Sequence, residues 1–187
     1  ELHAIQDVAF YAMISLAETR DNDTGNHILR TQTYIKHLAE KLRQNPRYAS
    51  QLCDDVIKLI CKSAPLHDIG KIGIPDYILL KKGNLTEDEF EIMKTHTTIG
   101  YDAISNAEKV SGQQMDFLKY AKEIAHSHHE HWDGNGYPAG LAGKAIPIEA
   151  RIVAVCDVFD ALTHERCYKP AWPIERALQT LQDGAGT

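Results

Sequence analysis

The sequence lacks most features that mark secreted, membrane-spanning or nucleic-acid-binding proteins. No apolar run is long enough to cross a bilayer, and no secretion signal is recognisable in it. Its four cysteines show no CxxC spacing, so we expect no disulfides and a reducing compartment. The net charge of −6 disfavours binding to long nucleic acid. Together these absences predict a cytoplasmic protein without membrane insertion and without a long nucleic-acid partner.

Sustained strand-like alternation of apolar and polar residues is also absent. Apolar residues instead recur at helical spacing, which predicts helices at about 5–16, 27–42, 52–64, 86–97, 117–127, 147–162 and after Pro173. Thr86 followed by Glu89 predicts a capping box, whereas 69–85 and 133–146 contain several glycines and predict irregular loops. We predict a single all-α domain over residues 1–187, excised from a longer regulatory protein because both ends look cut.

Histidine and aspartate are concentrated in a few short segments. His67 and Asp68 follow a helix that Pro65 ends, and His128 and His129 fall at the end of another helix. Asp157 interrupts an apolar stripe, where a carboxylate is costly unless it forms a salt bridge or coordinates a metal. Alone, each of these residues has a simpler structural explanation.

As a set with His27 and His96, these side chains exceed what one four-coordinate ion needs. Imidazole and carboxylate together favour divalent transition metals. The set therefore predicts a site with two or more metals and favours metal-assisted phosphoester hydrolysis.

The motifs together resemble the HD-GYP family, a branch of the HD phosphohydrolase superfamily. They comprise Thr24-Gly25-Asn26-His27, HDIGK at 67–71, the segment 94–100, HHExWDGxGYP at 128–138 and the segment 157–163. The similarity extends from about Ser15 to about Leu181. The resemblance implies an HD-type helical bundle with a metal centre in its core. It also implies hydrolysis of cyclic di-GMP, a ring of two guanylates, through a metal-bridging hydroxide, with pGpG as the first product and GMP as a candidate second product.

Carried over position by position, the resemblance implies a set of metal ligands in this chain. They are His27, His67, Asp68, His96, His128, His129 and Asp157. Asp68 would bridge two metals, and iron or manganese is expected, with nickel and zinc as alternatives. Many relatives have glutamate four residues before His27 and hold a third metal there; this chain has the shorter Asp23, so we expect two.

The resemblance also implies roles outside the metal ligands. Lys71 would act beside Asp68 in catalysis, although a solvated loop lysine is the simpler interpretation. Arg166 and Lys169 match positions that grip the ligand's phosphates, and arginine suits bidentate phosphate contact. The loop with Gly136, Tyr137 and Pro138 is expected to be a tight turn presenting His128 and His129, or a lip over the substrate in which Tyr137 contacts the ligand.

Two alternatives to cyclic di-GMP hydrolysis stay open at this point. One is a phosphodiesterase for another cyclic dinucleotide such as 3'3'-cyclic GMP-AMP, which differs by one base, because the sequence does not show which residues contact the bases. The other is a non-catalytic cyclic-dinucleotide sensor or docking module. A diguanylate cyclase (GGDEF) domain is a candidate partner for the GYP loop, and the family typically carries an upstream sensory or receiver domain.

Overall fold

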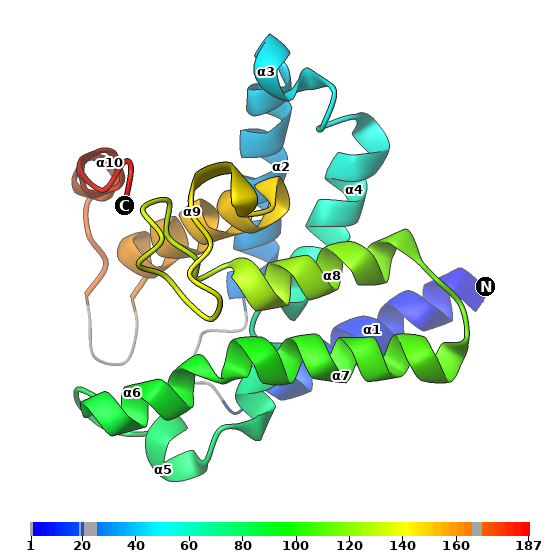
Figure 1. Cartoon of the computed structure of the whole chain (residues 1–187), viewed down its shortest axis with the longest axis horizontal. Coiled ribbons are helices and arrows are strands. Elements are labelled where there is room, and N and C mark those ends of the chain that lie inside the picture. Colours follow the sequence, from blue (N-terminus) through cyan, green and yellow to red (C-terminus); the bar gives the residue numbers. More distant parts are fainter. Residues whose placement is uncertain (1, 19, 21–25, 166–169) are drawn as a thin grey trace.

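The computed structural model is helical throughout its described part (Figure 1), which comprises residues 2–18, 20, 26–165 and 170–187, with backbone alone for 2–7, 9 and 18. Its α-helices are α1 Leu2–Glu18, α2 His27–Arg43, α3 Pro46–Ala49, α4 Asp54–Ser63, α5 Asp76–Leu79, α6 Glu87–Lys94, α7 His96–Ser111, α8 Asp116–Ser127, α9 Ile148–Thr163 and α10 Ile174–Asp183. Three 3₁₀ turns are η1 Ala64–Leu66, η2 Ile69–Gly73 and η3 Gly143–Ala145. Extended pairing in these residues is limited to one isolated bridge between Asp133 and Ala142, so the all-α prediction is confirmed.

The helix ends follow local side-chain chemistry, and one boundary differs from the prediction. Thr86 and Glu89 form the expected capping box at the start of α6. The helix was expected to continue to residue 97, but α6 ends at Lys94 and α7 begins at His96. The Thr95 hydroxyl donates to the Ile92 carbonyl at 2.6 Å, a local hydrogen bond of the kind that competes with helical pairing. The break reorients the chain at His96.

The segment 69–85 is also more regular than expected, because it contains η2 and the short helix α5. Its glycines predicted a loop, but Gly70 lies in the 3₁₀ turn η2 and allows that turn to pack closely against α7. Pro147 and Pro173 were expected as first helical residues but are the residues immediately before α9 and α10. A shift of one residue at a helix end is ordinary. Among the described residues, none of the helices is both long and apolar enough to span a membrane.

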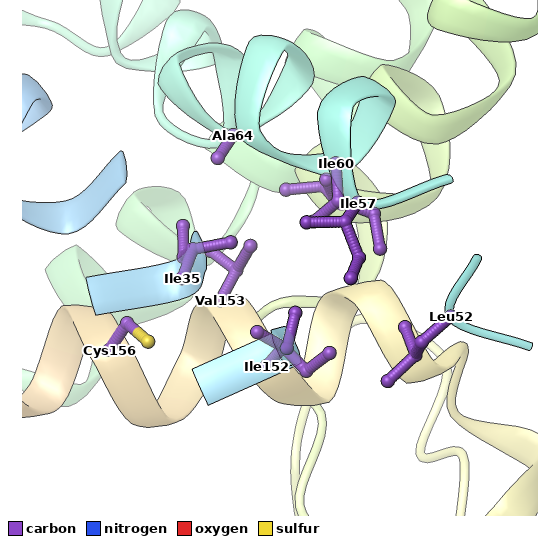
Figure 2. Close-up of a cluster of buried hydrophobic side chains, with 10 residues drawn as sticks. Ile35, Leu52, Ile57, Ile60, Ala64, Ile152, Val153 and Cys156 are labelled. Atoms are coloured by element: carbon purple, nitrogen blue, oxygen red, sulfur yellow. The ribbon is translucent and has the colours of Figure 1, made fainter. Parts of the chain in front are cut away.

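Two apolar clusters meet at α8. The first joins α2, α4 and α9 (Figure 2), and its buried side chains include Ile35, Ile57, Ile60, Ile152, Val153 and Cys156. The second joins α1, α2 and α7 to α8 and includes Ile14, Ile28, Leu66 and Ile104. α8 supplies Ile124 to the first cluster and Ala121 and Ala125 to the second. Burial of each isoleucine is worth roughly 2 kcal/mol, so contacts with both clusters hold α8 and its carboxyl end in place.

A bare glycine lets η2 pack directly against α7, which runs beside α8 (Figure 1). A Cβ atom on Gly70 would lie 1.9 Å from the His96 carbonyl oxygen and 2.6 Å from the Gly100 nitrogen. Any side chain at Gly70 would therefore separate η2 from α7. Because Asp68 and Lys71 flank Gly70 in the chain, this contact brings them beside the first turn of α7.

Candidate metal centre

The structure gathers the seven histidine and aspartate residues with implied ligand roles into two adjacent groups. Potential ligand atoms within 4.8 Å of one another define the Asp68 cluster, which consists of Asp68, His96, His128 and His129. The same limit defines the His27 cluster, which consists of His27, His67 and Asp157. Helices α2, α7 and α9, the residues directly after α8, and the junction of η1 and η2 contribute these side chains. Segments far apart in the sequence thus meet in one place.

Asp68 lies between the two clusters, and its two carboxylate oxygens face different partners. Oδ1 is 3.4 Å from Nε2 of His96 and 3.7 Å from Nε2 of His128. Oδ2 is 3.2 Å from Nε2 of His67, which is itself 3.9 Å from Oδ1 of Asp157. A single carboxylate is therefore positioned to contact a cation in each cluster.

Two buried atoms at this junction lack a hydrogen-bond partner. They are Oδ1 of Asp68 and Nε2 of His67; the latter lies near Oδ2 of Asp68, but without the direction of a hydrogen bond. Unpaired buried polar atoms are costly, and a bound cation would satisfy both. Imidazole and carboxylate donors without a thiolate suit divalent iron, manganese, nickel or zinc. The residues present therefore fit a metal centre.

Three of the imidazoles are anchored through Nδ1 to the backbone of their own segment. Each donates its Nδ1–H to a carbonyl three or four residues earlier, which directs Nε2 into the site and, in the neutral imidazole, leaves Nε2 free to bind a metal. The pairs are His67 with Ala64 at 2.8 Å, His96 with Met93 at 2.7 Å and His128 with Ile124 at 3.0 Å. This is the tautomer that a metal-ligating histidine requires.

His27 is anchored differently, through a carboxylate on α9. Its Nδ1 lies 2.7 Å from Oδ2 of Asp160, and Arg30 holds the same carboxylate with two hydrogen bonds of 2.7 and 2.8 Å. Asp160 is 1% exposed. Burial tends to raise the pKa of Asp160, but hydrogen bonds from Arg30 and His27 dominate and lower it below its usual range.

Sequence reasoning assigned no role to Asp160 or Arg30. The available signal was their spacing: Asp160 is one helical turn after Asp157, and Arg30 is one turn after His27. Both pairs therefore share a face with a candidate ligand.

Opposing influences set the protonation of Asp68 and His67. Burial raises the pKa of Asp68, yet the charges of Lys71 and His67 hold it well below its usual range. Burial likewise lowers the pKa of His67, but Asp68 and Asp157 outweigh it and raise that pKa to about 9. Asp68 is therefore ionised at neutral pH, and a cation bound at His67 would replace the proton that these carboxylates attract.

The Asp68 cluster favours neutral imidazoles. Burial lowers the pKa of His96 to about 4, with Asp68 opposing and His128 reinforcing the shift. Burial and the neighbouring His128 lower the pKa of His129 to about 2. Neutral imidazoles beside an ionised carboxylate are the protonation states that metal ligation needs.

Lys71 reaches the same carboxylate from η2. Its Nζ lies 2.8 Å from Oδ2 of Asp68, and its side chain is 23% exposed. A fully solvated loop lysine, the simpler expectation, would not make this contact. The structure places the ammonium group of Lys71 at the edge of the candidate centre.

The loop with Gly136, Tyr137 and Pro138 folds back over the end of α8. A Cβ on Gly136 would lie 2.2 Å from the His131 nitrogen, so the backbone packs too closely for any side chain. The ring of Tyr137 stacks on His129 with centroids 4.8 Å apart, and Lys94 of α6 lies 5.7 Å from the Tyr137 centroid. The loop thus covers the Asp68 cluster, as a turn that presents its histidines would.

Three residues with implied roles lie outside the described part of the chain. They are Asp23, at the third-metal position, and the two phosphate-gripping candidates Arg166 and Lys169.

The chain belongs to the HD domain family, whose model matches residues 22–187. A "Cyclic di-GMP phosphodiesterase" from Vibrio cholerae is 52% identical over 186 residues, which are 100% of this chain and 38% of that protein. A "3'3'-cGAMP-specific phosphodiesterase 2" from the same organism is 38% identical over 176 residues, covering 94% of this chain and 31% of that protein. The chain thus spans less than half the length of these curated relatives.

A solved structure has a similar fold. It is a HDG"Y"P protein from Bdellovibrio bacteriovorus, with a TM-score of 0.59, 20% identity and coverage of 89% of this chain and 50% of that one. At this identity the likeness concerns the fold alone. With the family match and the relatives, it confirms the resemblance to the HD-GYP family and the prediction of an HD-type helical bundle.

Proposed function

We propose that this chain is a phosphodiesterase domain that hydrolyses cyclic di-GMP with the help of two divalent cations. One observation carries the proposal: the two oxygens of Asp68 face separate ligand clusters, and the buried Oδ1 has no hydrogen-bond partner. The relative that is 52% identical over the whole chain bears the name of that activity, which supports the same substrate here.

Asp68, His96, His128 and His129 would hold one cation, and Asp68, His27, His67 and Asp157 the other. Such a pair supplies Lewis acidity: it lowers the pKa of a shared water towards neutrality and neutralises charge on the phosphate. Iron or manganese is our first expectation, with nickel and zinc as alternatives. A third metal is not expected with Asp23 in place of glutamate.

The protein's own groups would prepare the phosphate for attack. The ionised Asp68 holds the ammonium group of Lys71 at the edge of the site. From there the ammonium group would stabilise the developing charge on a non-bridging phosphate oxygen or protonate the departing 3′ oxygen. Arg166 and Lys169 would grip the phosphates, and Tyr137 would form a wall beside the ligand.

Substrate preference within the cyclic dinucleotides is the finer part of the proposal. The relative named for 3'3'-cGAMP is 38% identical, against 52% for the one named for cyclic di-GMP. This difference favours cyclic di-GMP and makes 3'3'-cyclic GMP-AMP the second candidate. Opening to pGpG is the expected first step, and hydrolysis onward to GMP is the second.

The partners and the setting are proposed from the same relatives. They are more than twice as long as the segment they share with this chain, which supports a sensory or receiver domain in the same polypeptide. A diguanylate cyclase domain is a candidate for docking on the GYP loop. The cytoplasm is the expected location.

The test is turnover and metal content measured on the same samples. Anaerobically purified protein loaded with Mn²⁺ or Fe²⁺ is given cyclic di-GMP and 3'3'-cyclic GMP-AMP at equal concentration, and the products are followed by chromatography. We expect two metals per chain and faster loss of cyclic di-GMP. Binding of intact ligand without turnover by metal-replete protein would instead support the sensor alternative.

A variant of Lys71 separates its role from metal binding. Lys71→Met should retain both metals and lose about 10²–10³-fold in kcat, as removal of a charge-stabilising group does. Lys58→Met is the matched control, because Lys58 is an exposed lysine paired with Asp55 on α4. Full activity of Lys71→Met would remove Lys71 from the mechanism.

A further inference from the structure

His129 differs from the other imidazoles of the site in how it is held. His27, His67, His96 and His128 each have an Nδ1 hydrogen bond to a carbonyl or to Asp160. Neither ring nitrogen of His129 makes a hydrogen bond within the described residues, although the residue is only partly exposed. An imidazole without such a partner is free to rotate about its side-chain bonds unless neighbouring groups confine it.

Ring contacts confine His129 instead. Tyr137 stacks on one face at 4.8 Å and an interplanar angle of 26°. His96 meets the ring edge-on at 5.1 Å, and the His128 ring lies 4.0 Å away. Tyr137 also donates its backbone N–H to the His129 carbonyl oxygen at 3.1 Å, which ties its position to the residue on which it stacks.

Glu130, the next residue in the chain, holds the loop that carries Tyr137. One carboxylate oxygen accepts from the Ala139 N–H and the other from the Leu141 N–H, each at 2.8 Å. The side chain of Glu130 is almost completely buried, so water does not compete for these bonds. Hydrogen bonds to a carboxylate are stronger than neutral ones. Glu130 thus fixes the loop at two points after Pro138, namely Ala139 and Leu141.

We propose that Tyr137 and Glu130 are positioning residues that orient His129 as a ligand. Glu130 fixes the loop, the loop presses the ring of Tyr137 onto His129, and the stack takes the place of the missing Nδ1 hydrogen bond. The inference rests on the proposed metal centre and gives the GYP loop a role in assembling it. It requires the aromatic ring of Tyr137 and not its hydroxyl group.

The test is Mn²⁺ binding to the purified protein, followed by electron paramagnetic resonance and by metal content. Tyr137→Phe keeps the ring, and we expect it to bind two Mn²⁺ as tightly as the unmodified protein. Tyr137→Leu removes the stack and should weaken one of the two sites by about 10–100-fold, the usual effect of losing a group that orients a ligand. The spin-coupled signal of a Mn²⁺ pair should fall accordingly, while the other site stays filled.

Glu130→Gln and Tyr77→Leu complete the set. Glu130→Gln keeps the shape but replaces one acceptor oxygen with a donor, so it should weaken the same site in the same direction, even if Tyr137→Leu proves unable to fold. Tyr77→Leu alters an exposed tyrosine on α5 and should leave both sites unchanged. Two tightly bound Mn²⁺ in Glu130→Gln and Tyr137→Leu would overturn this inference. Fewer than two in the unmodified protein would overturn the proposed metal centre itself.

Discussion

The two ligand clusters are assembled by different means. In the Asp68 cluster, His96 and His128 are anchored to carbonyls of the turn that precedes them. In the His27 cluster, His67 is anchored in the same way, but His27 is anchored to Asp160, which lies 133 residues later on another helix. The first arrangement depends on local backbone geometry, whereas the second depends on the packing of α2 against α9.

The difference has consequences for robustness. A backbone carbonyl cannot be removed by a substitution, so the anchors of His96 and His128 are lost only if the backbone moves. The anchor of His27 is a single buried carboxylate balanced by Arg30, and loss of one partner from such a pair leaves the other charge uncompensated. The His27 cluster should therefore be the more sensitive to single substitutions and to acid.

Replacing Asp68 should break both clusters at once and have the largest effect. Asp68→Asn removes the charge that both clusters share, so we expect metal content to fall at both sites. Activity should fall at least about 10³-fold, since even one lost electrostatic contact to a reacting group costs 10²–10³. Metal analysis and cyclic di-GMP turnover are the measurements, with the exposed Asp55→Asn as control. Retention of two metals by Asp68→Asn would contradict the bridging role.

Substitution of Gly70 should break the backbone arrangement of the Asp68 cluster. In Gly70→Ala the new methyl group would meet the His96 carbonyl at 1.9 Å, so η2 and α7 must separate. Overpacking of this kind destabilises by roughly 1–3 kcal/mol, and the affinity for metal should fall with it. Urea unfolding of Gly70→Ala and of the unmodified protein measures the loss in free energy of unfolding.

Gly184→Ala is the matched control for this change. Its methyl group would lie 3.4 Å from the nearest atom, an ordinary contact. Equal stability of the two alanine variants would show that the contact between η2 and α7 is more tolerant than its geometry indicates.

Asp160→Asn should weaken the His27 cluster alone. The amide keeps the shape but loses the charge that orients His27, so the affinity for one metal should fall about 10–100-fold. The exposed Asp183→Asn is the control. Loss of both metals together would show that the two clusters do not respond independently.

The pH dependence of stability gives a second readout for Asp160. Its pKa is lowered in the folded state, so its contribution is present above the unfolded value of about 4 and is lost as the pH falls below it. The unmodified protein should therefore lose stability more steeply than Asp160→Asn in acid. If the unmodified protein and Asp160→Asn lost stability equally steeply in acid, Asp160 would not have a lowered pKa in the folded state.

Much of the fold follows from apolar spacing and local signals. The apolar spacing over residues 27–42 and the capping box at Thr86 indicated helices that the structure contains. The break at Thr95 did not follow from these signals, since a hydroxyl that competes with helical pairing is compatible with a continuous helix as well. The 3₁₀ turn η2 was also missed, because the closeness of Gly70 to α7 is a tertiary contact.

The site was less predictable than the fold. Adjacent histidines and aspartates suggested metal chemistry, but the grouping of seven ligands came from a family resemblance and not from spacing. The anchors of these ligands could not be read from the sequence. Asp160 reaches His27 only through the packing of α2 on α9, and Glu130 reaches its partners only because the loop folds back.

The smallest effect on the two clusters is expected from Glu149, at a contact between the helices that lead to them. Glu149 is a buried residue in the first turn of α9, beside Glu123 of α8. Burial and a hydrogen bond with Glu123 raise the pKa of Glu149 to about 8 from an ordinary value of 4.5. Between these values the folded protein retains a proton that the unfolded chain has released, so the free energy of unfolding falls as the pH rises.

Glu149→Gln removes this dependence without removing either cluster. It should be more stable than the unmodified protein at pH 8 by at least about 1 kcal/mol, since each unit of pKa shift corresponds to about 1.4 kcal/mol. The difference should shrink towards pH 5, and Glu40→Gln, at a partly exposed position, should show neither effect. Urea unfolding at pH 8 and pH 5 with Mn²⁺ present measures the difference in free energy of unfolding between Glu149→Gln and the unmodified protein. An unchanged slope in Glu149→Gln would mean that the helices carrying the two clusters meet without a shared proton.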